Sequence, residues 1–230
     1  MKLHGLQKMT LLDFPGRVAC TVFLGGCDFR CPFCHNFELA DGTAKPVMDS
    51  NEFLSFLSKR KGLLDGVAFT GGEPLLHPDL PELMAAIRKE GFSIKLDTNG
   101  FHPDRLEEVL KRNLVDYVAM DVKNSPEKYA LTCGVETLDL ARIRESVSLL
   151  KNGKTDYEFR TTVVKEFHEA GDFEAIGKEI AGAKRYFLQK FTDRDTVPFR
   201  NLSAPSPEEM KTYAKIARRY VPETRLRGVE

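Results

Sequence analysis

The chain has 230 residues, of which 42% are hydrophobic and 30% charged, a composition typical of a globular protein large enough to bury a full core. Its 34 basic residues balance 34 acidic ones, and this zero net charge argues against a nucleic-acid-binding protein, which needs surplus Lys and Arg. No apolar run approaches the ~20 residues of a membrane span and the start lacks a secretion signal, so we expect a cytoplasmic protein with no membrane partner.

Short apolar or β-branched runs alternate with amphipathic stretches whose apolar residues are three and four positions apart. The runs predict strands at residues 18–24, 66–70, 92–97, 115–122, 157–164 and 185–191. The amphipathic stretches predict helices near residues 53–57, 80–91, 106–110, 140–150 and 173–180, with Ser50 as the N-cap of the first. A last helix begins after Ser206, where Pro207 and Glu209 complete a capping pattern, and residues 225–229 form one more strand or a closing arm.

Strands that alternate with helices favour a parallel sheet with right-handed crossovers, either open and doubly wound or curved into a full or partial barrel. In both arrangements ligands bind at the carboxyl ends of the strands. Unusual segments follow the first four strands, at residues 25–34, 70–74, 97–100 and 121–124, so we expect one site at one edge of the sheet. We treat residues 1–230 as a single domain, with a C-terminal helix and tail at 204–230.

Three of the five cysteines fall within eight positions, as Cys27, Cys31 and Cys34. Their spacing would suit one face of a helix, but Pro32 disfavours a helix and favours a loop wrapped around an object. An iron–sulfur cube is such an object and usually takes four thiolates, so three would leave one iron open to a non-protein ligand. The other two cysteines, Cys20 and Cys133, stand apart, and we predict that they are packing residues.

Three alternative roles for these cysteines stay open. They could be buried as small hydrophobic residues, although three so close together among polar neighbours are uncommon. They could bind zinc, with His35 as the fourth ligand. The segment Cys31–Cys34 also resembles a thiol–disulfide oxidoreductase motif, and Thr196–Pro198 resembles the cis-proline segment of glutaredoxins, but Cys27 has no role in that fold.

The spacing Cys27-x-x-x-Cys31-x-x-Cys34, with the aromatic Phe33 before the last cysteine, resembles the cluster motif of the radical S-adenosylmethionine (AdoMet) enzymes. The resemblance implies a [4Fe-4S] cluster held by the three cysteines, with AdoMet bound through its amino and carboxylate groups to the open iron. It also implies an α/β fold that is a partial (β/α)6 TIM-like barrel, and the likeness places the core of this domain at about residues 9–191. Residues 37–69 contain no cysteine, so a single cluster is the prediction.

Segments after the later strands resemble the AdoMet-binding segments of this superfamily. Thr70-Gly71-Gly72-Glu73-Pro74 resembles the segment that holds the AdoMet amino group, where Glu73 would accept hydrogen bonds from an ammonium group. A lone Gly-Gly pair would be a plain turn. Taken singly, an Asp at a strand end is equally well the N-cap of the next helix.

A second set of residues resembles the glycyl-radical-enzyme activases, the branch that includes the pyruvate formate-lyase activating enzyme. Its members are Asp97, Thr98, Asn99, Asp121, Lys123, Arg160 and Gln189. In that branch an acidic pair, here Asp97 and Asp121, helps hold a monovalent cation beside the AdoMet carboxylate. Lys123 and Arg160 match the basic AdoMet contacts, and Gln189 falls where the pyruvate formate-lyase activase has a histidine.

The segment before the first strand narrows the resemblance further. Residues 12–17 resemble the Asp-Gly-Pro-Gly-x-Arg stretch of those activases, although alone they would be a tight turn. Three of these residues would line the rim where a protein substrate enters: Asp13, Gly16 and Arg17. Cys34-His35-Asn36 completes the activase pattern and places His35 beside the cofactors. The form Leu-Asp-Phe-Pro-Gly looks most like the activators of the anaerobic ribonucleoside-triphosphate reductase.

The resemblance implies that AdoMet is cleaved reductively to a 5′-deoxyadenosyl radical, which abstracts hydrogen from a glycine Cα of a partner glycyl radical enzyme. It also implies a flavodoxin- or ferredoxin-type electron donor. One alternative is a radical AdoMet enzyme that acts on a small molecule, such as 7-carboxy-7-deazaguanine synthase, with a closed polar pocket and a Mg²⁺ site. Another is a non-catalytic zinc or electron-transfer module.

Overall fold

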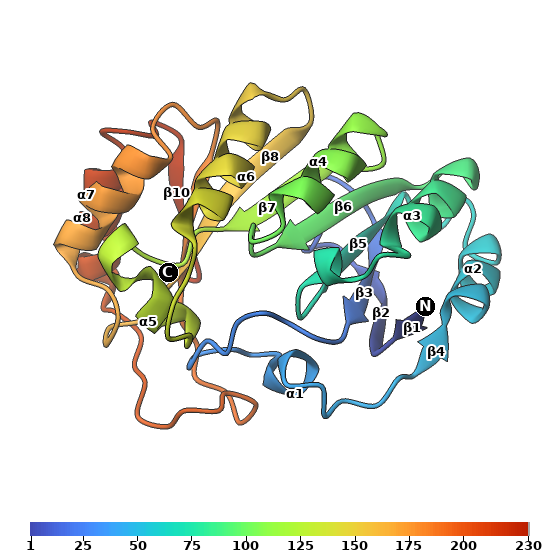
Figure 1. Cartoon of the computed structure of the whole chain (residues 1–230), viewed down its shortest axis with the longest axis horizontal. Coiled ribbons are helices and arrows are strands. Elements are labelled where there is room, and N and C mark those ends of the chain that lie inside the picture. The colour runs from blue at the N-terminus through green and yellow to red at the C-terminus, as the bar shows by residue number, and fades with distance from the viewer. Residues whose placement is uncertain (230) are drawn as a thin grey trace.

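An eight-stranded sheet forms the centre of the protein, and the computed structural model describes residues 1–229 (Figure 1). In spatial order the strands are β10 (Thr224–Arg227), β9 (Tyr186–Lys190), β8 (Asp156–Val163), β7 (Tyr117–Asp121), β6 (Ser93–Thr98), β5 (Gly66–Gly71), β3 (Ala19–Leu24) and β2 (Gly5–Thr10). All neighbouring pairs are parallel except β2 with β3. A separate short ladder pairs β1 (Lys2–Leu3) with β4 (Met48–Asp49).

The six strands predicted from apolar runs are all present, as β3 and β5 to β9. The outer strand β10 confirms a strand near residues 225–229. Strand β2 was not predicted, because its sequence GLQKMT is short of apolar residues and lies half exposed at the sheet edge. Because β2 and β10 stand at opposite ends of the order and the ribbon curves between them (Figure 1), the fold is the expected α/β partial barrel.

Eight α-helices occur in the described residues: α1 (Phe37–Ala40), α2 (Ser50–Ser58), α3 (Leu80–Lys89), α4 (Pro103–Lys111), α5 (Tyr129–Cys133), α6 (Leu140–Asn152), α7 (Ala170–Glu179) and α8 (Pro207–Ala217). The N-cap of α2 is Asp49 and not Ser50. The Asp49 carboxylate accepts hydrogen bonds from the Asn51 and Glu52 N–H groups, and the Glu52 carboxylate accepts one from the Asp49 N–H. The predicted capping box at Ser206 is confirmed for α8.

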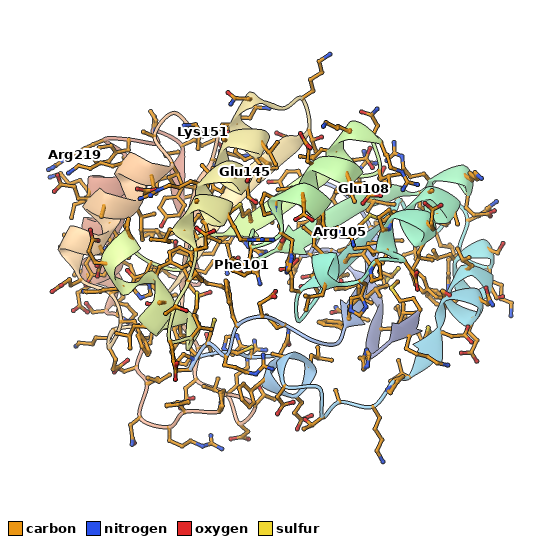
Figure 2. The ribbon with its side chains drawn as sticks, in the orientation of Figure 1. Phe101, Arg105, Glu108, Glu145, Lys151 and Arg219 are labelled. Carbon is orange, nitrogen blue, oxygen red and sulfur yellow. The ribbon has the colours of Figure 1, made fainter. Side chains whose placement is uncertain are left out.

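The larger helices follow the outer face of the curved sheet (Figure 1). Outward-facing strand residues such as Phe69, Leu96 and Phe159 are fully buried, because side chains alternate along a strand and this set meets the helices. The solvent faces of the helices carry charged side chains, as Figure 2 shows for Arg105 on α4 and Glu145 on α6. No helix within residues 1–229 combines the length and the apolar character needed to cross a membrane.

The inner face of the sheet changes character from one end of the strands to the other. Near the amino ends, Phe14, Ala19, Tyr117 and Ala119 form a small apolar cluster. Near the carboxyl ends the inward positions are polar or charged, and they include Asp97, Asp121 and Arg160. Apolar packing therefore closes the half-barrel at the amino ends of the strands, and a polar site is left at their carboxyl ends.

Candidate cofactor site

A cavity of about 250 Å³ lies at the carboxyl ends of the parallel strands. Among its lining residues are the sequence-predicted Cys27, Cys31, Phe33, Cys34, His35, Gly71, Gly72, Asp97, Thr98, Asn99, Asp121, Lys123, Arg160 and Gln189. The structure thus brings the cysteine segment and five strand ends to one place. The lining also includes Asn36 and Thr70, which belong to the motifs named above, and Phe29, Ala40 and Thr162, which the sequence analysis did not single out. The signal that could have found Thr162 is its position two residues after Arg160, which puts both on the inner face of one strand.

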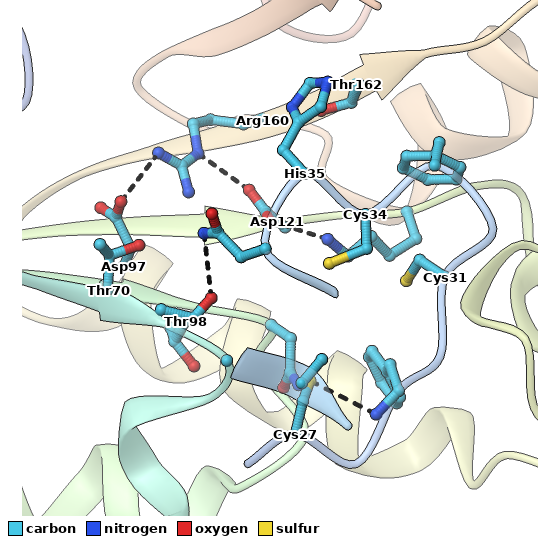
Figure 3. A pocket seen from close by; sticks show the side chains of 18 of the residues that line it. Cys27, Cys31, Cys34, His35, Thr70, Asp97, Thr98, Asp121, Arg160 and Thr162 are labelled. Atoms are coloured by element: carbon cyan, nitrogen blue, oxygen red, sulfur yellow. Dashed lines mark hydrogen bonds and ion pairs between the residues drawn. The ribbon is translucent and has the colours of Figure 1, made fainter. Parts of the chain in front are cut away.

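The three cysteines lie in an irregular loop, residues 25–36, that follows β3, and the prediction of a loop at Pro32 is confirmed. The loop is tightened by a hydrogen bond from the Cys34 N–H to the Cys31 carbonyl at 3.1 Å. Figure 3 shows the sulfur atoms of Cys31 and Cys34 directed into the space that Cys27 borders from the other side. The loop therefore presents three thiols to one shared volume.

Two hydrogen-bond donors are directed at the sulfur of Cys27. The Phe29 N–H donates to the Cys27 sulfur at 3.4 Å, and the Asn99 amide nitrogen donates to the same sulfur at 3.8 Å. Burial raises the pKa of the Cys27 thiol to about 12, whereas a hydrogen bond from Cys133 lowers the pKa of Cys31 to about 7. Cys133, predicted as a packing residue, is indeed buried, and its carbonyl also accepts a hydrogen bond from the Arg30 N–H of the cysteine loop at 2.8 Å.

The chemistry of this donor set fits an iron–sulfur cluster. Thiolates are the usual ligands of such clusters, and N–H groups directed at sulfur suit an anionic ligand. Within residues 1–229 no group of three or more His, Cys, Asp or Glu side chains is placed to hold a single metal ion. The His35 ring nitrogen Nε2 is 2.7 Å from the Thr192 carbonyl, and its ring stacks on Phe191 at 5.7 Å. His35 therefore faces away from the thiols (Figure 3), unlike the fourth ligand of a zinc site.

Gly71 and Gly72 allow two backbone segments to touch at the base of the cysteine loop. The Gly72 N–H donates to the Leu24 carbonyl at 2.8 Å, and the next N–H along the chain donates to the Gly26 carbonyl at 2.7 Å. A Cβ on Gly72 would lie 1.9 Å from the Gly26 oxygen, and one on Gly71 would lie 2.3 Å from the Leu24 oxygen. Gly71 also has a φ of +124°, a conformation that other residues rarely adopt. The two glycines are therefore required for the loop to reach its position.

Glu73 lies behind the cavity wall. We had expected its carboxylate to line the cavity and to face a ligand ammonium group. Its carboxylate is fully buried and accepts hydrogen bonds from the Leu75 N–H at 3.0 Å, the Thr98 hydroxyl at 2.8 Å and the Asn99 N–H at 2.6 Å. Pro74 is buried beside it at the start of a 3₁₀ turn (Pro74–Leu76). The carboxylate thus joins the turn after β5 to the end of β6. The side-chain direction after two glycines could not be read from the sequence.

Stability should depend on pH through Glu73. Burial raises the pKa of its carboxyl from 4.5 to about 7, although three donors oppose this. The folded state then keeps a proton that the unfolded state releases, so this contribution is complete below pH 4.5 and is lost as the pH rises through about 7. Between about pH 5.5 and about pH 8 we expect the wild type to lose on the order of 2 kcal/mol more unfolding free energy than Glu73→Gln. Anaerobic denaturant titrations at both pH values measure this difference, and equal slopes would contradict it.

Arg160 links the two acidic residues that end β6 and β7. Its Nε donates to Asp121 at 2.8 Å and its Nη1 to Asp97 at 3.4 Å (Figure 3). Lys123 pairs with Asp121 at 2.9 Å, and Lys95 pairs with Asp97. Burial is the largest single effect and would raise the pKa of both carboxyls, but Arg160 and the paired lysines together outweigh it and lower both, that of Asp121 to about 2. The cavity floor therefore carries two charged carboxylates, Asp97 and Asp121, next to the cations Lys123 and Arg160.

Replacing Arg160 should cost both ligand affinity and stability. In Arg160→Leu each of the two carboxylates would keep its ion pair with a lysine. The positive charge of the guanidinium, which both carboxylates share, would be lost. We expect AdoMet affinity to fall roughly 10- to 100-fold, as for loss of a charge-assisted hydrogen bond. Arg160→Lys is the matched control, because it keeps the charge and loses the bridge, and it should be intermediate. Anaerobic calorimetric titration with AdoMet measures the change, and unchanged affinity in a folded Arg160→Leu protein would exclude a ligand-binding role.

The predicted entrance residues lie apart from the cavity. Asp13 accepts a hydrogen bond from the Thr21 hydroxyl on the inner face of β3. Gly16 has a φ of +71°, as a tight turn requires. Arg17 stacks over Phe14 at the amino ends of the strands, where the apolar cluster closes the half-barrel. This segment follows β2 and so borders the open side of the sheet, and its role as a rim stays a prediction.

Comparison with known proteins agrees with this site. A family model described as the Radical SAM superfamily matches residues 21–175. A Methanocaldococcus jannaschii protein provisionally described as a glycyl-radical enzyme activating enzyme is 31% identical over 235 residues, which cover 99% of this chain and 96% of that protein. The pyruvate formate-lyase-activating enzyme of Clostridium pasteurianum is 33% identical over 128 residues, 54% of this chain and 52% of that enzyme.

The fold agrees as well. A solved domain of pyruvate-formate lyase-activating enzyme from Bacteroides vulgatus matches 71% of this chain and 99% of its own, with a TM-score of 0.57 and 20% sequence identity. At that identity the likeness concerns the fold alone. On the matched family model and on a relative similar along its whole length, the chain belongs to the radical SAM superfamily, whose cofactors are a [4Fe-4S] cluster and AdoMet, and it matches the branch of glycyl-radical-enzyme activating enzymes.

Proposed function

We propose that the chain activates a glycyl radical enzyme, and that its target is an anaerobic ribonucleoside-triphosphate reductase. The observation that carries the proposal is a single cavity with three thiols on one side and Lys123 and Arg160 on the floor. Thiols suit a cluster, and two cations suit the carboxylate of an amino-acid ligand. The choice of target rests on the segment Leu12–Gly16, which resembles the activators of that reductase.

Each side chain of the site has a role in this proposal. Cys27, Cys31 and Cys34 would hold the cluster, and Lys123 with Arg160 would attract the AdoMet carboxylate. When bound, these cofactors supply a 5′-deoxyadenosyl radical that takes a hydrogen atom from a glycine Cα of the partner enzyme. The protein needs no acid or base for that step and contributes orientation and the exclusion of water.

The open side of the half-barrel supports a protein substrate. Strands β2 and β10 end the sheet at opposite sides, so an extended loop has a route to the inner face that a closed barrel would deny. Asp13, Gly16 and Arg17 border this route in the proposal. The proposal also includes a monovalent cation near Asp97 and Asp121. This ion would compete with the basic side chains that already pair with both carboxylates. The electron donor would be of the flavodoxin or ferredoxin type.

Electron paramagnetic resonance of a mixed reaction tests the proposal. The anaerobically reconstituted protein is incubated with AdoMet, dithionite and either an anaerobic ribonucleotide reductase or pyruvate formate-lyase. We expect a glycyl radical signal in the reductase and none in the lyase. A signal in the lyase alone would reassign the target within the branch. AdoMet cleavage with no radical in either enzyme would favour the alternative of a small-molecule substrate.

A further inference from the structure

The carboxyl-terminal strand places Arg227 directly behind the wall of the cavity. Arg227 is aligned with Gln189 in the parallel pair of β10 and β9. Its Nη1 and Nη2 atoms donate to the two carboxylate oxygens of Glu158 at 2.7 and 2.9 Å. The guanidinium carbon lies 3.6 Å from the ring centroid of Phe187. A bidentate ion pair and a stacked ring together fix both the position and the plane of the guanidinium.

The anchor of this arginine is itself held in place. Glu158 is buried on the inner face of β8, and its carboxylate also accepts a hydrogen bond from the Tyr117 hydroxyl at 2.7 Å. Strands β7, β8 and β10 therefore share one small network under the cavity floor. A guanidinium fixed in this way can set the orientation of any further group that it contacts.

The further group is the side chain of Gln189. Nη1 of Arg227 also donates to the Gln189 Oε1 atom at 3.3 Å. A guanidinium has donors and no acceptor, so the amide oxygen and not the amide nitrogen must face it, which removes the usual ambiguity of an amide orientation. Gln189 lines the cavity, so its –NH₂ group is left as the donor on that side. At the carboxyl end of β9, Gln189 therefore has a hydrogen-bond donor and not an acceptor available to a molecule in the cavity.

We propose that Arg227 is a positioning residue that holds Gln189 as a hydrogen-bond donor toward an oxygen of bound AdoMet. The inference rests on the AdoMet site of the proposed function and assigns a role to a part of the chain outside the recognised motifs. It concerns cofactor binding and not the identity of the partner enzyme. A failure to activate any particular glycyl radical enzyme would therefore leave it standing.

Anaerobic titration of the cluster-loaded protein with AdoMet tests the inference. Gln189→Glu keeps the size and the contact with Arg227 but removes the donor, and we expect affinity to fall roughly tenfold. Arg227→Gln frees the amide to turn, and we expect a loss of about threefold to tenfold. Arg225→Ala is the matched control: Arg225 lies on the same strand, is exposed and pairs with Glu223, so its removal should leave the affinity unchanged.

A double-mutant cycle separates positioning from general support of the fold. In a Gln189→Leu background Arg227→Gln should change the affinity less than about twofold, because the group it positions is gone. An equal loss in both backgrounds, or wild-type affinity in Gln189→Glu, would overturn the inference. If Arg227→Gln fails to fold because Glu158 keeps only Tyr117, the Arg227→Gln/Glu158→Gln protein replaces it, since no buried charge is then left unpaired. A wild type that does not bind AdoMet would overturn both this inference and the proposed function.

Discussion

Replacing any one of Cys27, Cys31 and Cys34 by alanine is expected to abolish the iron–sulfur cluster. The three thiols are the whole set of protein ligands that the loop offers to the cavity, and each would hold a different iron. Loss of one leaves a second iron without a protein ligand. After anaerobic reconstitution, iron should fall from about four atoms per chain to fewer than about one, with loss of the brown colour and of AdoMet cleavage.

Two control variants sharpen this result. Cys20→Ala removes a buried thiol of β3 that lies outside the cavity, so this protein should load iron as the wild type does. His35→Ala should also keep the cluster, because the His35 ring faces the Thr192 carbonyl and not the thiols. A wild type that bound zinc in place of iron, and lost it in His35→Ala, would refute the cluster and restore the zinc alternative.

The order of elements could be predicted from the sequence because the central strands are buried on both faces. Residues 66–69 of β5 and 117–120 of β7 are continuous runs without a charged residue, and they stand out from the flanking helices. Strand β2 is an edge strand in which three consecutive residues, 7–9, are exposed, and short helices such as α1 lack enough turns to show a period. The cap of α2 was misplaced by one residue, because Asp49 and Ser50 are both good caps and only the hydrogen bonds distinguish them.

The membership of the site could be predicted better than its geometry. Parallel strands end at one edge, so residues that follow them must converge, and the structure brings Asp97, Asp121 and Arg160 together. The direction of a side chain after a turn is a property of the backbone conformation. For that reason Glu73 was expected in the cavity and lies behind it. The contact between Arg227 and Gln189 joins residues 38 positions apart on neighbouring strands, and no local pattern could have predicted that pairing.

Gly72→Ala is expected to displace the cysteine loop and to destabilise the protein. The new Cβ would lie 1.9 Å from the Gly26 oxygen, which is backbone and cannot turn aside as a flexible side chain can. Either the loop moves, taking Cys27 with it, or the turn after β5 loses its two backbone hydrogen bonds, to Leu24 and to Gly26. We expect a loss of about 2–4 kcal/mol of unfolding free energy, together with cluster loading below half that of the wild type. Thermal unfolding and iron analysis of the same anaerobic samples measure both.

Other glycines of the chain isolate the cause of this effect. Gly171 lies in α7, and a Cβ added there would meet nothing within 4 Å, so Gly171→Ala should be neutral or stabilising by up to about 1 kcal/mol. Gly182 also has open space but a φ of +77°, so Gly182→Ala reports the cost of backbone strain without a clash. If Gly72→Ala cost no more than Gly182→Ala and loaded a full cluster, close backbone contact would not be what fixes the loop. A larger loss of unfolding free energy in Gly72→Ala than in Gly182→Ala, together with reduced cluster loading, would show that the close approach of the two backbone segments positions the thiols.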